Sequence, residues 1–330
     1  MAKVLIHSEG KVFLEALSEA RIKITVELTH PNIFSPRTSW ETNYGEDLIE
    51  HILKIKGAAW LCDEIARDED PEYVRKNLQN ELFAYFDAKD FAGKRILDFG
   101  CGSGASTSIL ACLFPASEIA GIDLYPELLE IARHRVQFYN FSNVVLRQSP
   151  SPDNLPPDLG EFDFVILSAV FEHFLPAERQ KLVPKIWETV RNGGFLFLNQ
   201  TPNRLFPLEL HTTMLPFINY LPDKLAHLAA RRFAKRVQQD ESWEMLLRRG
   251  IRGATVGEIR RLLQGSRLIL PTKNGIKDRV DLYYLTTNPK RKKIAKSIAK
   301  GVLKMINFAT GIAIVPELAL VFKKISPPEK

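Results

Sequence analysis

The chain has 330 residues, 45% of them apolar and 25% charged, which is ordinary for a globular protein and fits one large domain with extensions, or two small ones. The formal net charge is +6, but seven positive residues without an acid lie between Lys290 and Lys304, and subtracting these seven leaves −1. The positive charge therefore belongs to one segment, which excludes a basic surface spread over the whole protein.

The apolar stretches and the cysteines predict the compartment. The start of the chain lacks an apolar run long enough for a secretory signal, and the longest apolar region, Met305–Phe322, is broken by Pro316 and Glu317. Three cysteines make neither a disulfide framework nor a spaced set of metal ligands. We therefore expect a cytoplasmic protein with no membrane span and no metal site.

Residues 1–90 are predicted to be a mostly helical extension or lid, with helices over Gly45–Ala66 and Pro71–Phe86. From Gly93 onward, β-rich apolar runs alternate with helical stretches, the pattern of a parallel sheet covered by helices on both faces. The predicted strands are Arg95–Phe99, Glu118–Asp123, Asn143–Arg147, Phe162–Ser168 and Gly194–Asn199. The helices between them are Ala105–Leu113, Pro126–Asn140 and Glu178–Arg191, the last ended by Asn192-Gly193-Gly194.

This rhythm stops after Asn199, where a proline-rich segment of mixed aromatic and basic composition predicts a substrate-cap insertion over residues 200–254. A helix over Thr255–Gln264, strands near Arg267–Thr272 and Val280–Thr286, and a last strand over Glu317–Lys323 are expected to follow. The sequence thus predicts an α/β fold over residues 91–325, Rossmann-like, with a mostly parallel seven-stranded sheet.

The most specific motif is Ile96–Gly104, in which a strand runs into three alternate glycines, Gly100, Gly102 and Gly104, and then a helix. Glycines in such a turn tolerate unusual φ values and let a ligand approach the backbone. Asp123 ends the next strand, where a carboxylate can accept hydrogen bonds from both ribose hydroxyls of a nucleoside. The two elements together predict a nucleoside cofactor.

Four motifs in this order resemble the class I S-adenosylmethionine-dependent methyltransferases, of the ubiquinone-biosynthesis-like type that modifies small molecules. The resemblance covers about residues 93–199 and rests on the turn Leu97–Gly104, on Gly121–Leu124, on Phe162–Ser168 and on Asn192–Leu196. It implies S-adenosylmethionine as the cofactor. The cofactor-binding residues that it implies are Asp98, Gly100, Cys101, Gly102 and Gly104 for the methionine part, Asp123 for the ribose, Leu124 for the adenine, and Ser168.

The segment after the third strand departs from this family, since relatives usually carry an acidic residue near the adenine amino group. Counting back from Leu155 and Pro156 places Ser151 at that position, and Ser149 or Asp153 could serve if the loop differs in length. The residue that contacts the adenine is therefore left open.

A dinucleotide-dependent dehydrogenase is the main alternative, because Gly100–Ala105 also fits a looser dinucleotide-binding fingerprint. Tyr220 and Lys224 even have the spacing used by short-chain dehydrogenases, but Pro222 between them disfavours the helical turn that would bring both side chains to one face. A cofactor-binding protein without catalysis is a further alternative.

Two histidines are candidates for a catalytic base if the methyl group goes to a hydroxyl. His173 lies just beyond the fourth strand and His211 in the insertion, although His173 could only shape the pocket and His211 could be a solvated loop residue. The sequence Ser168–Phe171 lacks the Asn/Asp-Pro-Pro-aromatic turn of adenine N-methyltransferases. We therefore predict O-methylation of a small or lipid-linked acceptor.

Residues 288–312 are predicted to form a basic amphipathic helix, because Ile294, Ile298 and Val302 recur every four residues and lysines recur on the opposite face. One interpretation packs the apolar side on the protein and leaves the lysines solvated. The other makes residues 290–312 a peripheral membrane contact at the inner face of a membrane. An RNA methyltransferase that uses the lysines to bind phosphate stays an alternative, although nucleic acid is the less favoured partner. The sequence does not indicate an oligomeric state.

Overall fold

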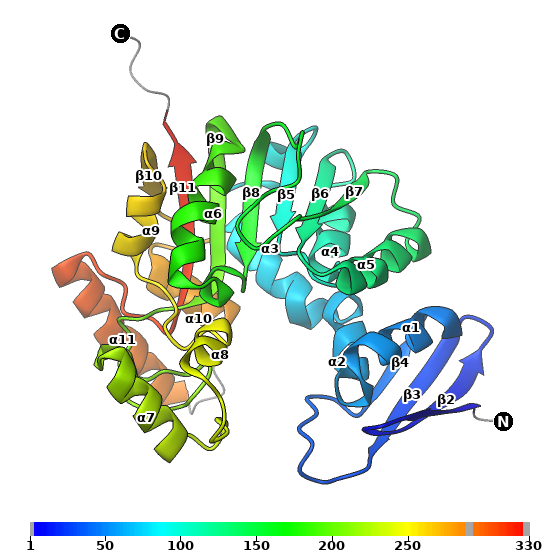
Figure 1. The fold of residues 1–330 in the computed structure, drawn as a ribbon. Coiled ribbons are helices and arrows are strands. Elements are labelled where there is room, and N and C mark those ends of the chain that lie inside the picture. The colour runs from blue at the N-terminus through cyan, green and yellow to red at the C-terminus, as the bar shows by residue number, and fades with distance from the viewer. Residues whose placement is uncertain (1–2, 288–292, 326–330) are drawn as a thin grey trace. The chain divides into compact units, whose positions relative to one another are not determined.

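The computed structural model describes residues 3–287 and 293–325, and it describes side chains for all of these except 293–295. The chain divides into two compact units. The first unit comprises Met1–Gln79 and Cys101–Gln148, and the second comprises Asn80–Gly100 and Ser149–Lys330. Figure 1 follows their elements along the chain.

A four-stranded antiparallel sheet opens the first unit. Its strands, in spatial order, are β1 (Lys3–His7), β2 (Gly10–Ser18), β3 (Arg21–Leu28) and β4 (Ser39–Thr42). The prediction of a mostly helical extension is therefore wrong for residues 3–42. Apolar side chains are buried at alternate positions, Val12 and Leu14 in β2 and Ile24 and Val26 in β3, and this period of two is that of a strand with one buried face.

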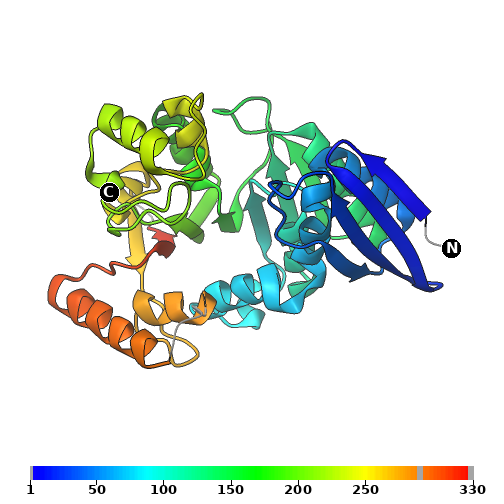
Figure 2. The ribbon, with the colours of Figure 1, turned by 90° about the horizontal axis from the view of Figure 1, so that it is seen from below.

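Helices follow this sheet, as predicted for the rest of the extension. Their bounds are α1 (Glu46–Lys56), α2 (Ala58–Glu69), a short π-helical turn η1 (Pro71–Arg75) and α3 (Lys76–Phe83). Gly57, with φ +79°, breaks the expected helix over Gly45–Ala66 into α1 and α2. Ile49, Ile52, Leu61 and Ile65 pack with the buried face of the sheet into one core, and Figure 2 shows the two helices against the blue strands.

The larger sheet has seven strands in the order β10-β11-β9-β8-β5-β6-β7. The pairs β6/β7, β5/β8 and β8/β9 are parallel, and β9/β11 and β10/β11 are antiparallel. Its strands are β5 (Arg95–Phe99), β6 (Glu118–Asp123), β7 (Val144–Gln148), β8 (Phe162–Ser168), β9 (Val190–Pro202), β10 (Ser266–Ile269) and β11 (Glu317–Lys324). The predicted fold class is confirmed, and β5 and β8 have the nearly continuous burial of parallel strands covered on both faces.

Helices lie between these strands. In the first unit they are α4 (Ala105–Leu113) and α5 (Pro126–Phe138), and in the second α6 (Pro176–Glu188) and α9 (Val256–Leu262). The predicted helix over Glu178–Arg191 ends earlier, at Glu188. Asn192 and Gly193 instead lie inside β9, where the register with β8 shifts and Gly193 has φ +78°, as in a bulge.

The insertion and the carboxyl-terminal part of the second unit add further helices. They are α7 (Asp223–Phe233), α8 (Trp243–Arg248), α10 (Arg279–Thr286) and α11 (Lys293–Thr310), with 3₁₀ turns η2 (Ala88–Phe91), η3 (Phe171–His173) and η4 (Ile218–Tyr220). The predicted strand at Val280–Thr286 is wrong, because Asp278 caps a helix there by accepting a hydrogen bond from the backbone N of Asp281 at 2.8 Å. Among the residues described, no helix is long and apolar enough to cross a membrane.

Candidate active site

The glycine turn of the first unit is held by the end of β6. The backbone N of Gly102 donates to Oδ2 of Asp123 at 2.8 Å, and the backbone N of Tyr125 donates to Oδ1 at 3.0 Å. Cys101 N also donates to Ile122 O at 3.0 Å. Two predicted cofactor-binding elements, the turn and the carboxylate at the end of β6, therefore meet. Each carboxylate oxygen of Asp123 keeps a lone pair for a ligand hydroxyl.

The three glycines of the motif serve different purposes. Gly102 has φ +55°, and a Cβ added there would meet no atom within 4 Å, so the backbone is open to a ligand at this point. A Cβ on Gly104 would lie 2.6 Å from Cβ of Ala132, which allows close packing of α4 against α5. A Cβ on Gly100, within the second unit, would lie 2.6 Å from Cγ2 of Val170. Only Gly102 thus matches the prediction that the glycines clear space for a ligand.

A buried ionic network lies behind this turn, and the sequence interpretation missed it. Arg135 on α5 is fully buried and donates from Nη1 to the backbone O of Ser103 at 2.7 Å. Its guanidinium pairs with Oε1 of Glu64 at 3.0 Å and with Oδ1 of Asp68 at 3.3 Å, both on α2. The hydroxyl of Ser103 donates to Glu64 as well. The network joins the amino-terminal helices to the cofactor turn.

Burial raises the pKa of Glu64, but the positive charges of Arg135 and Lys56 outweigh it and bring this pKa down to about 2. The carboxylate is therefore charged at neutral pH. Arg135 was detectable as the one basic residue on the otherwise apolar buried face of α5, which contains Leu129, Ile131 and Ala132.

The remaining predicted cofactor residues lie at strand ends and in a turn. Asp98 is buried in β5, and Leu124 is half-buried directly after β6. Ser168 ends β8, and its buried Oγ has no hydrogen-bond partner among the residues described. Ser151 lies in a turn after β7 and donates to Oδ1 of Asp153 at 2.9 Å. The roles of these residues toward a cofactor stay predictions.

A cluster of side chains in the second unit joins the two predicted catalytic histidines to Glu172. One ligand atom each from Glu172, His173 and His211 lies within 4.8 Å of the others. Glu172 and His173 belong to η3 after β8, whereas His211 comes from the insertion. The sequence interpretation considered both histidines, but it did not predict that they meet Glu172.

The loop that carries His211 is held by a buried carboxylate. Oε1 of Glu209 accepts from the backbone N of His211 at 2.7 Å and of Thr212 at 2.8 Å, and Oε2 accepts from the Oγ1 of Thr213 at 2.6 Å. Gly250 lies directly against the cluster, because a Cβ there would be 2.9 Å from Cδ2 of His211 and 3.0 Å from Cγ of Glu172. This packing fixes His211 although its side chain is exposed.

The ring of His173 has a defined orientation. Its Nδ1 lies 2.6 Å from the backbone O of Arg248, and since a carbonyl only accepts, Nδ1 carries the proton. Burial lowers the pKa of both His173 and His211 from its usual value, which favours the neutral form of each ring. The Nε2 of His173 is therefore a lone-pair acceptor at the carboxyl end of β8.

Burial raises the pKa of Glu172 to about 7. Its Oε2 accepts from Oγ1 of Thr201 at 3.1 Å, and its Oε1 has no hydrogen-bond partner in the described part of the chain. A second buried acid of this unit, Glu81, has its pKa raised to about 8. Glu172 and Glu81 are thus buried carboxyls with raised pKa values and without an ion-paired lysine or arginine among the described residues.

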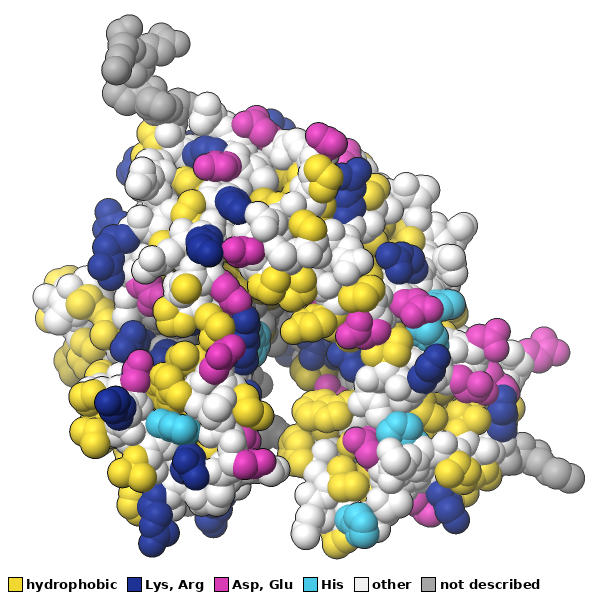
Figure 3. All heavy atoms as spheres, in the orientation of Figure 1, with side chains coloured by type: hydrophobic (Ala, Val, Ile, Leu, Met, Phe, Trp, Pro, Cys, Tyr) yellow, Lys and Arg dark blue, Asp and Glu magenta, His cyan; other side chains and the backbone are white. Residues whose placement is uncertain are grey.

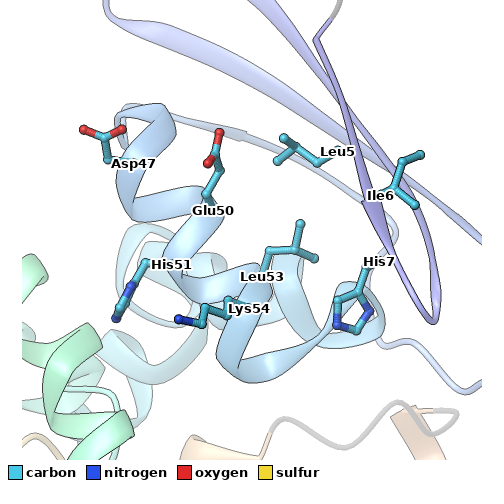
Figure 4. Close-up of a pocket in the computed structure, with 8 residues that line it drawn as sticks. All are labelled: Leu5, Ile6, His7, Asp47, Glu50, His51, Leu53 and Lys54. Carbon is cyan, nitrogen blue, oxygen red and sulfur yellow. The ribbon is translucent and has the colours of Figure 1, made fainter.

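One cavity of about 550 Å³ lies in the first unit between β1 and α1 (Figure 4). Its lining mixes apolar and charged side chains: Leu5, Ile6, His7, Asp47, Glu50, His51, Leu53 and Lys54. None of these is a predicted site residue, so we do not assign the cofactor to this cavity.

Residues 96–194 match the family model described as a methyltransferase domain. The match spans the strand, glycine turn and β6 carboxylate described above, and it ends within β9. The match supports a class I S-adenosylmethionine-dependent methyltransferase domain over these residues. The predicted cofactor, S-adenosylmethionine, is confirmed, and the dehydrogenase alternative is set aside.

Curated relatives of this methyltransferase match part of its length. A ribosomal protein L11 methyltransferase from Erwinia tasmaniensis is 27% identical over 48% of this chain and 54% of that protein. A trans-aconitate 2-methyltransferase from Paracidovorax citrulli is 29% identical over 37% of this chain and 44% of that protein. The chain thus spans about half the length of the curated relatives it matches.

Among solved structures, an O-methyltransferase family protein from Burkholderia thailandensis superimposes with a TM-score of 0.43 at 13% identity, covering 83% of this chain and 64% of that one. The predicted ubiquinone-biosynthesis-like subtype stays a prediction.

Proposed function

We propose that this methyltransferase transfers the methyl group of S-adenosylmethionine to a hydroxyl oxygen of a small-molecule or lipid-linked acceptor. The sulfonium is already an activated donor, so the protein's main task is to hold the nucleophile in line with the methyl carbon. The acceptor oxygen bonds to that carbon while the carbon–sulfur bond breaks, the hydroxyl proton passes to a base, and S-adenosylhomocysteine leaves.

The oriented imidazole of His173 carries this proposal. Its Nε2 lone pair faces a cluster at the end of β8, and a neutral imidazole is the group that accepts a hydroxyl proton near pH 7. His211 supports the same role from the insertion. Tyr220, the residue that the dehydrogenase alternative requires, instead donates its hydroxyl to the backbone O of Leu205 at 2.6 Å.

An acceptor panel with labelled S-adenosylmethionine tests the hydroxyl assignment. We expect methyl ethers or esters as products, and kcat lowered about 10²- to 10⁴-fold in His173→Ala. His227→Ala is the matched control, because that histidine contacts the backbone O of Glu241 and lies outside the cluster. N-methylated products, or an unchanged kcat in His173→Ala, would contradict the proposal.

The proposed ribose ligand is Asp123, since its carboxylate lies at the turn and keeps free lone pairs. We expect Asp123→Ala to weaken binding of S-adenosylmethionine and S-adenosylhomocysteine by about 10- to 100-fold in calorimetric titration, because hydrogen bonds to a charged acceptor are lost. Asp123→Asn keeps one acceptor oxygen and should lose less. Glu118→Ala, at the opposite end of β6, is the control.

A lipid-linked acceptor requires that the protein reach a membrane, and α11 supplies a surface for this. Its outward side chains are apolar: Ile298 is 64% exposed, Met305 66% and Phe308 94%. Figure 3 shows hydrophobic side chains over the left edge, where α11 lies in Figure 1. An apolar helix face of this kind can enter the boundary between lipid headgroups and acyl chains.

Ion pairs of two lysines hold one face of α11 against α10. Lys300 Nζ pairs with Oδ1 of Asp281 at 2.8 Å, and Lys304 Nζ pairs with Oδ2 of Asp281 at 2.7 Å and with Asp278 at 3.4 Å. These lysines thus face α10, and the interpretation that buries the apolar side is wrong for Ile298 and Val302; the side chain of Ile294 lies outside the described residues. The RNA methyltransferase alternative needs lysines that bind phosphate, and Lys300 and Lys304 are instead ion-paired with Asp281.

The proposed occupant of this face is an anionic lipid surface, because four basic residues, Lys290–Lys293, immediately precede the apolar positions in the sequence. Co-sedimentation with phosphatidylglycerol vesicles tests this. We expect Met305→Asp combined with Phe308→Asp to lower partitioning at least about tenfold, because each buried side chain contributes about 1.5 to 3 kcal/mol. Equal partitioning of the wild type and the double variant would contradict the proposal. So would self-association of the wild type in the absence of lipid, if the double variant lacks it.

A further inference from the structure

We propose that Glu172, His173 and His211 bind a divalent metal ion, a site that the sequence interpretation did not predict. One carboxylate oxygen and two imidazole nitrogens converge here, all within 4.8 Å of one another and all within the second unit. Two histidines and one carboxylate form the ligand set of zinc and manganese sites that leave positions open for a further oxygen ligand.

The unpaired oxygen of Glu172 is the first argument. Glu172 is fully buried, and its Oε1 has no hydrogen-bond donor among the described residues. The guanidinium of Arg179 donates from Nη2 to the backbone O of Glu172 at 3.3 Å. Its Nη1 donates to the backbone O of Gly253 and to Glu258, so both donors are used elsewhere than on the Glu172 carboxylate oxygens. A buried carboxylate oxygen without a donor is costly, and the unpaired Oε1 of Glu172 therefore indicates a missing positive partner.

The second argument is the tautomer of His173. Its Nδ1 proton is bound to the Arg248 carbonyl, so the Nε2 lone pair faces Oε1 of Glu172 at 3.8 Å. Two lone-pair atoms at this distance are too far apart for a direct hydrogen bond and repel each other, whereas a cation between them would bind both. A ring nitrogen that donates to a backbone carbonyl while the other faces the ligand is the usual arrangement around metal-binding histidines.

The backbone of Gly250 approaches the cluster closely. Gly250 has φ +89°, and any Cβ there would crowd both His211 and Glu172. Ligand atoms around one zinc ion lie about 3 to 3.5 Å apart, so the three ligand atoms, which lie within 4.8 Å of one another, have to move closer together when an ion binds. The exposed side chain of His211 provides an entry route from solvent.

The role of the ion rests on the proposed function. An open coordination position would bind the acceptor's hydroxyl oxygen and lower the pKa of that hydroxyl, so that its proton leaves to solvent before the oxygen attacks the methyl carbon. With the ion bound, both histidines act as its ligands, and the lowered pKa of the bound hydroxyl takes the place of the base role assigned to His173 above. Methyl transfer to a hydroxyl oxygen is the same in both cases. The proposal thus narrows the acceptors to molecules whose reacting hydroxyl can coordinate a cation.

Calorimetric titration of the chelator-treated full chain with Zn²⁺, Mn²⁺ and Mg²⁺ tests the site without any cofactor or acceptor. We expect one ion per chain, and binding weakened at least 30-fold in His211→Ala and in Glu172→Gln. His134→Ala is the control, because His51, Glu130 and His134 form the other histidine–carboxylate group in the described residues. No saturable binding, binding retained in both cluster variants, or binding lost in His134→Ala would overturn the proposal.

A second measurement separates this site from the proposed function. If the ion positions the acceptor, methyl transfer should fall after chelation and return when the bound metal species is added, while S-adenosylmethionine affinity stays the same. Metal binding with chelation-resistant methyl transfer would overturn the catalytic role alone. Absent methyl transfer with intact metal titration would instead contradict the proposed function.

Discussion

Two buried acidic groups of this chain differ in how their charge is balanced. In the first unit, Glu64 lies against Arg135, and Lys56 lies 3.3 Å from its Oε2. In the second, Glu172 has a hydroxyl donor on one oxygen and no donor on the other within the described residues. Their pKa values are accordingly about 2 and about 7. A paired carboxylate stabilises the fold, and an unpaired one in a cluster of histidines indicates a ligand site.

The largest expected effect comes from removing Arg135, the cation that pairs with Glu64. Arg135→Met leaves Glu64 and Asp68 buried without their partner, and we expect the free energy of unfolding to fall by about 3 to 5 kcal/mol. Urea denaturation measures this. Arg133→Met, on the exposed side of the same helix, should change stability by less than about 0.5 kcal/mol. Equal losses in both variants would mean that the network contributes little.

The two units also differ in how far their sites could be predicted from the sequence. The glycine turn and Asp123 belong to one continuous strand–turn–helix–strand unit, so their spacing alone predicts a nucleoside site. The meeting of Glu172 with His211 depends on how the insertion folds back, which Glu209 and Gly250 determine through contacts with no local pattern.

The fold was predictable to a similar degree. The strands β5 and β8 are almost continuously buried and apolar, whereas β2 and β3 bury only alternate residues in their central parts. Residues 279–286 contain tyrosines and leucine, which favour a strand, and the helix there depends on the Asp278 cap and on the ion pairs of Asp281 with α11. A side-chain cap and a tertiary ion pair thus outweighed local propensity.

The second prediction concerns the pH dependence of stability. Burial and the neighbouring Glu317 raise the pKa of Glu81 from 4.5 to about 8, against the opposing hydrogen bond from Gln200. The folded state therefore holds a proton that the unfolded state has lost, so this group's stabilising contribution is full below pH 4.5 and is lost as the pH rises through 8. We expect Glu81→Gln to flatten the fall in unfolding free energy over this range, by about 2 to 4 kcal/mol in total. An unchanged pH profile would show that Glu81 is ionised in the folded protein.

The third and smallest effect comes from replacing glutamate with glutamine, first at Glu64 and then at Glu172. Glu64→Gln removes the charge that Arg135 faces in a buried site, and we expect a loss of about 2 to 3 kcal/mol of unfolding free energy at pH 7. Glu172→Gln keeps the acceptor for Thr201 and removes no ion pair with Lys or Arg, so a change below about 1 kcal/mol is expected without metal. Urea denaturation of both variants in the presence of a chelator measures the two changes in unfolding free energy. A Glu172→Gln loss as large as that of Glu64→Gln would mean that this carboxylate stabilises the fold by itself, and the reason for assigning it a ligand would disappear.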